Sequence, residues 1–187
     1  MFTLRAWGSL PHVSRARGVY GVISLRDERQ PMSTFRVTAI PSEDLDRIRA
    51  QGKDDFGNPL VAGVNQEVGG PPLRCCLREA EEGERIALIA YQPSTIGGPY
   101  AEVGPVFVHA DACPGWTGTE YPESYHHRVQ LLRAYDQAGN QVDNIVVEPG
   151  QAEAGITDLL ARPEIAFLHS RNLLAGCWMF TVTRAAA

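Results

Sequence analysis

Short apolar runs separated by turn-forming residues limit the folds open to this chain more than any other feature. Residues 85–91 are nearly all apolar but too few to favour a helix, so they predict a central β-strand. Residues 125–135 alternate between polar and apolar side chains, and turn residues at 137–140 lead into a second run at 142–147. This pattern is typical of a β-hairpin. Further strands are predicted at residues 35–40, 105–109, 165–169 and 177–182.

Two short helices are expected between these strands. Residues 42–51 begin with Ser42 as a predicted N-cap, carry acidic side chains in the first turn and stop at Gly52. Residues 151–161 form the second predicted helix, which Gly155 interrupts.

Residues 52–72 are rich in Gly, Pro and Asn and predict a long surface loop. Taken together, these elements predict an α+β fold with a mostly antiparallel sheet of about six or seven strands and one or two short helices. We expect residues 32–187 to form a single globular domain, because a chain of 187 residues has room for one domain with a proper core.

Composition excludes several classes of partner. The net charge of −5 gives no basis for nucleic-acid binding, which requires clustered positive charge. No run of eighteen apolar residues occurs, so we expect no membrane partner. The four cysteines are too few and too unevenly spaced for a disulfide scaffold, and no export signal accompanies them. Reduced thiols and a cytoplasmic location are therefore expected.

Residues 1–31 differ in charge from the rest of the chain, with five arginines against only Asp27 and Glu28. One interpretation is a disordered extension, or an upstream start with the working protein beginning at Met32. The alternative is an arginine-rich targeting segment, which would require a eukaryotic source.

Metal ligation is one chemistry that the cysteines and histidines could support. His109 and Cys113 are four residues apart at the end of a predicted strand, a spacing that lets both reach one ion if the chain turns between them. Cys76 and the pair His169 and Cys177 would have to supply the remaining ligands. No Cys-x-x-Cys pair is present, so the sequence by itself assigns no metal and leaves the cofactor unknown. If a metal is bound, we expect His109, Cys113 and Cys177 to hold it.

The neighbouring residues Cys75 and Cys76 are expected to lie in a strand. Successive side chains of a strand point to opposite faces, so only one of the two thiols could join a site. We expect one buried thiol and one that is partly exposed.

Nucleophilic catalysis is a second chemistry. His169 and Cys177 lie in two predicted strands joined by seven residues, which could place them opposite each other. An imidazole beside a thiol makes it reactive, and Asn172 could orient the imidazole as the third member of a catalytic triad. The competing interpretation is a buried cysteine and a hydrogen-bonded histidine in a plain hairpin.

Two arginines stand where charge is unexpected. Arg74 precedes the cysteine pair, and Arg133 interrupts an apolar run. An inward-pointing arginine needs an anion, and either Glu102 or Asp111 is expected as the internal partner unless an anionic ligand takes that part. The ligand-binding residues would be Arg74, Cys76, His109 and Arg133, with His169 and Cys177 beside them.

Several segments, in this order, are similar to those of an uncharacterised bacterial family, the domain-of-unknown-function family numbered twelve hundred and three. The resemblance covers about Met32 to Arg184 and is carried by residues 74–78, 83–84, 99–100, 104–109, 132–135 and 169–177. It implies a bacterial, cytoplasmic protein and carries over no functional residue. The family often shows Pro-Cys-Arg-x-Cys-Leu where this chain has Leu73 in place of the first cysteine, which would remove a ligand if that pair held a metal.

Three functions from different classes follow from these observations. The first is a soluble module that binds a small, anionic molecule in a pocket lined by Cys, His and Arg. The second is a thiol-dependent enzyme that uses Cys177 with His169, or a metal-binding protein, and the third is a structural or partner-binding protein whose Cys and His residues only fill the core. The sequence leaves open whether the chain is an enzyme, which small molecule it binds and its oligomeric state.

Overall fold

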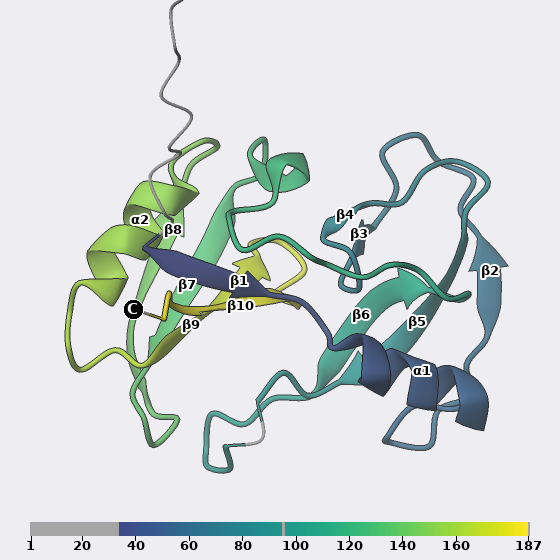
Figure 1. Cartoon of the computed structure of the whole chain (residues 1–187), viewed down its shortest axis with the longest axis horizontal. Helices are drawn as coiled ribbons and strands as arrows, with labels where there is room; N and C mark the ends of the chain where they lie inside the picture. The colour runs from purple at the N-terminus through teal and green to yellow at the C-terminus, as the bar shows by residue number, and fades with distance from the viewer. Residues whose placement is uncertain (1–33, 95, 187) are drawn as a thin grey trace, which may run out of the picture. The chain divides into compact units, whose positions relative to one another are not determined.

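The structure is a computed structural model that describes residues 34–94 and 96–186, all within the compact unit Ser33–Ala187. In this part of the chain, ten strands form two five-stranded sheets, accompanied by two α-helices and a short 3-10 helix (Figure 1). The α+β class is therefore confirmed in outline, whereas the prediction of one sheet with six or seven strands is wrong. The extension predicted for residues 1–31 lies outside the described residues.

The elements are, in chain order, β1 (Phe35–Thr38), α1 (Ser42–Gln51), β2 (Ala62–Val64), β3 (Pro72–Leu73), β4 (Arg78–Glu79), β5 (Arg85–Tyr91), β6 (Gly104–His109), η1 (Glu123–Tyr125), β7 (Gln130–Tyr135), β8 (Gln141–Val147), α2 (Ala152–Leu160), β9 (Phe167–Asn172) and β10 (Trp178–Arg184). Strands β2, β3 and β4 are only two or three residues long. Such short strands produce no periodic pattern in a sequence, which is why the second sheet was not predicted.

The first sheet has the strand order β1-β10-β9-β7-β8, and all its neighbours are antiparallel. Its inner face contributes fully buried side chains such as Leu132 and Phe180, which belong to the same core cluster as Ile156 of α2. Helix α2 packs against this sheet beside β7 and β8 (Figure 1). A Cβ atom at Gly155 would lie 2.8 Å from Cγ1 of Val147. Glycine at this position therefore allows α2 to approach the sheet closely.

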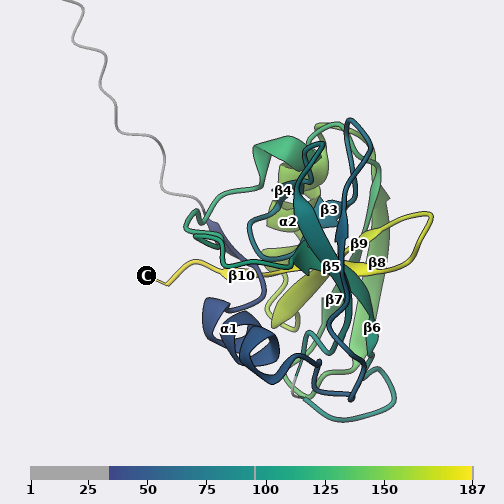
Figure 2. The ribbon, with the colours of Figure 1, turned by 90° about the vertical axis from the view of Figure 1, so that its right-hand side faces the viewer.

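The second sheet has the order β2-β5-β6-β3-β4. Strands β3 and β4 form a tight hairpin, and β3 runs parallel to β6 through the pair Leu73 and Phe107. The backbone N–H of Arg74 also donates to the carbonyl of Phe107 at 2.9 Å. This pairing holds the β3–β4 turn beside the end of β6, where His109 lies. Helix α1 lies beside β5 and β6 in both ribbon views (Figure 2).

Both predicted helices are confirmed, with a correction at the first residue of α1. Pro41, not Ser42, is the N-cap, and it makes no side-chain capping bond. The helix ends as predicted at Gly52, whose φ of 66° and N–H bond to the carbonyl of Arg49 close the last turn. Among the described residues, no helix combines the length and the hydropathy that crossing a membrane requires.

Candidate metal centre

Cys75 and Cys76 lie in the turn of the β3–β4 hairpin, and not in a strand as the sequence predicted. The turn is closed by the N–H of Leu77, which donates to the carbonyl of Leu73 at 3.0 Å. Leu77 itself adopts a positive φ of 54°, which is uncommon for a residue with a side chain. Because the chain reverses here, both thiols face the same way, and their sulfurs are 3.8 Å apart. The expectation that only one of them could join a site is wrong.

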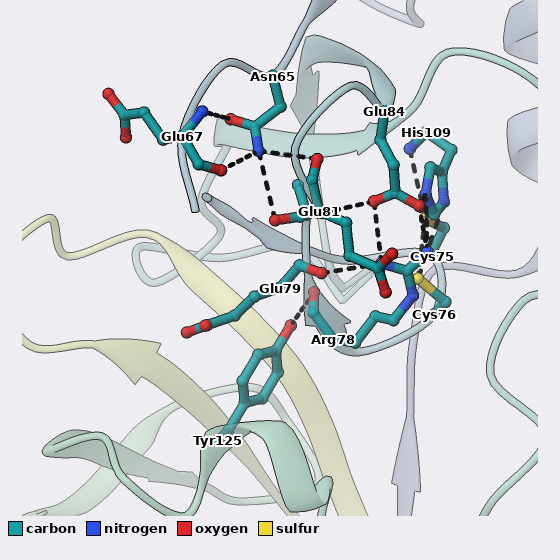
Figure 3. A network of polar contacts seen from close by, with 11 residues as sticks. Asn65, Glu67, Cys75, Cys76, Arg78, Glu79, Glu81, Glu84, His109 and Tyr125 are labelled. Atoms are coloured by element: carbon teal, nitrogen blue, oxygen red, sulfur yellow. Dashed lines mark hydrogen bonds and ion pairs between the residues drawn. The ribbon is translucent and has the colours of Figure 1, made fainter. Parts of the chain in front are cut away.

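The other two members of the cluster come from the end of β6 and from the loop that follows it. His109 is the last residue of β6, and its Nδ1 lies 3.4 Å from the sulfur of Cys75 and 3.8 Å from that of Cys76 (Figure 3). Cys113 completes the group, and one ligand atom from each of the four residues falls within 4.8 Å of all the others. All four cysteines of the chain, including Cys177, are free thiols.

These distances match those between the ligands of a zinc ion. Zn–S bonds of about 2.3 Å and Zn–N bonds of about 2.0 Å in a tetrahedron separate two sulfurs by about 3.8 Å, and a sulfur and a nitrogen by about 3.5 Å. The observed separations are 3.8 Å between the sulfurs of Cys75 and Cys76, and 3.4 and 3.8 Å from these sulfurs to His109 Nδ1. Three cysteines and one histidine are also a ligand set that zinc prefers. The residues present therefore fit a tetrahedral zinc centre.

The far side of the imidazole is held by charged residues. Nε2 of His109 lies 3.3 Å from Oε1 of Glu84 and 3.3 Å from Nη2 of Arg78 (Figure 3). In the tautomer with the hydrogen on Nε2, the imidazole donates to Glu84 and leaves the lone pair of Nδ1 directed to the sulfurs. Arg78 donates to both oxygens of Glu84, at 2.9 and 2.5 Å. This pairing lowers the pKa of Glu84 to about 2. A carboxylate that orients a histidine in this way is characteristic of protein metal sites.

The two neighbouring thiols differ in their surroundings. Cys75 is fully buried, and its sulfur accepts the backbone N–H of His109 at 3.4 Å. The contact with Cys76, together with burial, raises the pKa of Cys75, whereas the same contact lowers the pKa of the partly exposed Cys76. Helix α1 is linked to the cluster through Arg49, which donates to the backbone carbonyl of His109 at 3.2 Å.

Cys177 lies outside this cluster. Its sulfur accepts a hydrogen bond from Nη2 of Arg74 at 2.9 Å. Arg74 is 1% exposed and also donates to the carbonyls of Trp178 and Pro72. Of the three metal ligands expected from the sequence, the structure thus brings together His109 and Cys113, and it replaces Cys177 with Cys75 and Cys76.

The predicted pairing of His169 with Cys177 is not observed. In the register of β9 and β10, His169 lies opposite Thr181, and a shift in this register occurs between Trp178 and Phe180. The side-chain oxygen of Asn172 accepts the N–H groups of the next turn, at 3.0 and 2.9 Å. Asn172 therefore shapes the β9–β10 turn.

The four ligand-binding residues expected from the sequence do not share one pocket. Cys76 and His109 belong to the cluster, and Arg74 contacts Cys177. Arg133 donates to Oε1 of Glu102 at 2.6 Å, so one of its two expected internal partners is confirmed. The other expected partner, Asp111, lies 3.2 Å from Arg85 instead.

Sequence reasoning missed Cys75 as a ligand, and with it Glu84 and Arg78 as the residues behind the histidine. The turn at residues 74–77 contains no Gly, Pro or Asn to indicate it. A strand was therefore the natural prediction for the cysteine pair. The signal in the sequence was the four-residue spacing of His109 and Cys113, which predicted two of the four residues of the cluster.

Comparisons with known proteins place the cluster inside a recognised family region. A family model described as "Protein of unknown function (DUF1203)" matches residues 70–184, which include all four cluster residues. This match confirms the resemblance noted in the sequence, over a shorter range than Met32 to Arg184. No curated protein and no solved structure matches the chain.

Proposed function

Because the chain belongs to the DUF1203 family, whose function is unknown, its role must be inferred from the site, and we propose that it is a zinc-binding protein. The observation that carries this proposal is the convergence of Cys75, Cys76, Cys113 and His109, whose ligand atoms all lie within 4.8 Å of one another. Thiol groups are weak hydrogen-bond partners, so three cysteines and a histidine gain little from one another without an ion.

The zinc has a structural role in this proposal. Four protein ligands fill a tetrahedral coordination shell, which is the arrangement of structural zinc sites, whereas catalytic sites keep a position for water. The ion would connect the β3–β4 turn, which carries Cys75 and Cys76, to the end of β6 and the loop carrying Cys113. The β3–β4 hairpin has strands of only two residues, and Cys113 lies in an irregular loop. A shared metal ion would hold these two segments together where longer strands would be held by side-chain packing.

The geometry does not support His169 as a base for Cys177, which the thiol-dependent enzyme expected from the sequence requires. The sulfur of Cys177 contacts Arg74, and His169 lies opposite Thr181.

Metal analysis of the full chain tests the proposal. The protein is purified without a histidine tag, and its zinc content is measured by plasma mass spectrometry. We expect about one equivalent of zinc, lost in Cys113→Ser and in Cys76→Ser. Cys177→Ser is the matched control, because it removes a thiol outside the cluster, and it should retain the metal. Protein that contains no zinc and does not take up added Zn²⁺ would refute the proposal.

A further inference from the structure

A cleft of about 410 Å³ opens at the junction of the two sheets, away from the metal centre. It lies between residues 101–105, which lead into β6, and the end of the β9–β10 turn. Its apolar walls include the rings of Tyr91 and Trp178, whose centroids are 5.3 Å apart, together with Pro93 and Pro105. A cleft of this volume with aromatic walls is suited to a small, flat molecule.

Arg171 and Glu102 both line the cleft, and Arg133, which lies outside it, shares the carboxylate of Glu102 with Arg171. Arg171 is 8% exposed, and it donates through Nε to the carbonyl of Gly176 at 2.9 Å and through Nη1 to Glu102. Arg133 donates to the same carboxylate at 2.6 Å. Within the described part of the chain, Glu102 is the only carboxylate paired with either arginine. Two guanidinium groups therefore share one negative charge, and one positive charge is left without a partner.

Another arginine, which is fully buried, adds to this positive field. Arg74 lies behind Cys177, which lines the cleft, and its guanidinium donates to Cys177 and to two backbone carbonyls. Over the residues that the structure describes, Arg74 makes no ion pair with a carboxylate. Leaving a buried cation without a counter-charge is costly, so an anion bound in the cleft would be favoured.

The effect of this positive charge is seen at His169, which lies two residues before Arg171 on β9. It faces Arg133 across the strand pair, and its closest ring neighbours are Tyr135 and Phe167. Burial and the charges of Arg171 and Arg133 lower the pKa of His169 to about 3. The histidine is therefore neutral and adds no charge of its own.

We propose that this cleft binds a small aromatic carboxylate that carries a single negative charge. Its carboxylate would lie against Arg171, whose Nε and Nη1 are engaged by Gly176 and Glu102 and whose Nη2 makes no hydrogen bond within the described residues, so that Nη2 could donate a charge-assisted bond. Its ring would pack against Tyr91 and Trp178. Arg133, Arg171 and Glu102 together leave one positive charge without a counter-charge, which one carboxylate would balance, and Arg74 behind Cys177 adds further positive charge. The cluster residues Cys75, Cys76, His109 and Cys113 do not line this cleft, so the proposal is independent of the zinc site.

Calorimetric titration of the full chain with benzoate tests the proposal, with benzamide as a neutral molecule of nearly the same shape. We expect saturable binding of benzoate that is at least about tenfold tighter than that of benzamide, because the bond from an arginine to a carboxylate is charge-assisted. Equal binding of the two, or no saturable binding of benzoate, would overturn the proposal. Inorganic phosphate that binds as tightly as benzoate would also overturn it, because charge without a ring would then be sufficient.

Two variants locate the binding. Arg171→Gln should weaken benzoate by at least about tenfold, since it removes the charge and keeps a polar side chain. Ala175→Trp should block the cleft from its exposed rim without disturbing the core, and so abolish binding even if Arg171→Gln fails to fold. Arg85→Gln, at an exposed ion pair outside the cleft, is the control and should bind benzoate normally. Unchanged affinity in folded Ala175→Trp would place benzoate elsewhere and reject the proposal.

Discussion

Polar side chains are buried or half-buried at both sheets, but their hydrogen-bonding groups are satisfied in different ways. In the first sheet, Gln130 is 0% exposed, donates to the hydroxyl of Tyr121 and accepts a hydrogen bond from the hydroxyl of Ser170. Donors and acceptors therefore complement one another within the protein. Beside the second sheet, Cys75, Cys76, His109 and Cys113 bring together groups that are all metal ligands and poor partners for each other. Buried groups that complement one another as donors and acceptors require no additional partner. A cluster of like ligand groups leaves its members without good hydrogen bonds, which the proposed ion would replace.

Removal of the metal should have the largest effect on stability. A ligand that binds only the folded chain contributes about 4 kcal/mol to the free energy of unfolding when it is present at about 1,000 times its dissociation constant. We expect a loss of this order on chelation, measured by urea denaturation with and without a zinc chelator. Cys113→Ser should show the same low stability in both conditions, while Cys177→Ser should respond to the chelator like the unchanged protein. A wild-type chain with the same unfolding curve in both conditions would contradict the role assigned to the cluster.

Disruption of the Gln130 network should be costly, but independent of metal. Gln130→Leu leaves the hydroxyls of Tyr121 and Ser170 buried without their partner, at a cost of about 1–3 kcal/mol. Urea denaturation should give the same loss with and without the chelator, because the network lies in the first sheet. A loss that vanished in chelated protein would show that the two regions are not energetically separate.

The carboxylate behind His109 should tune metal affinity. Glu84→Ala removes the group that orients the imidazole, and we expect zinc to bind about 10- to 100-fold more weakly. Competition with a chromophoric chelator measures this change directly. Glu81→Gln is the matched control, because Glu81 is 79% exposed at the side chain and lies no closer than 3.8 Å to Arg78. Equal affinities in the two variants would remove Glu84 from the site.

The smallest effect is expected from the pH dependence that His169 confers. Its pKa is about 3 in the folded chain, against 6.5 when it is unperturbed. Between these values the unfolded chain binds a proton that the folded chain excludes, so stability falls as the pH drops below 6.5. The loss should reach about 1–2 kcal/mol at pH 5. Urea denaturation of chelated protein at pH 7.5 and pH 5 measures it without the pH dependence of metal binding.

His169→Phe should flatten this dependence, since a phenyl ring does not titrate and suits a site beside Tyr135 and Phe167. His127→Gln changes an exposed histidine and should leave the dependence unaltered. A persistent slope in folded His169→Phe would assign the effect to another group.

The sequence was sufficient to predict elements whose patterns are local. The apolar run of β5 and the β7–β8 hairpin were predicted because their signals lie within about ten neighbouring residues. The division into two sheets was not, because β3 joins the second sheet through Leu73 and Phe107, a pairing between distant residues that leaves no local pattern.

The candidate site divides in the same way. His109 and Cys113 were predicted together because their spacing of four residues is a local signal. The sequence also predicted Cys177 as a ligand, because spacing along the chain does not reveal which distant residues meet in the fold. The structure places Cys177 against Arg74. Leu73 is a fully buried core residue, and Cys75 takes part in the cluster from inside the turn. The positive φ of Leu77 that makes this turn has no signature in the sequence.

X-ray absorption at the zinc K-edge of the purified full chain tests the central claim most directly, because it counts the atoms bound to the ion. We predict three sulfurs at about 2.3 Å and one nitrogen at about 2.0 Å, as Cys75, Cys76, Cys113 and His109 would supply. Cys113→Ser should reduce the sulfur count, and Cys177→Ser should leave it at three. A coordination shell of oxygen and nitrogen atoms, or one sulfur fewer in Cys177→Ser, would contradict the assignment.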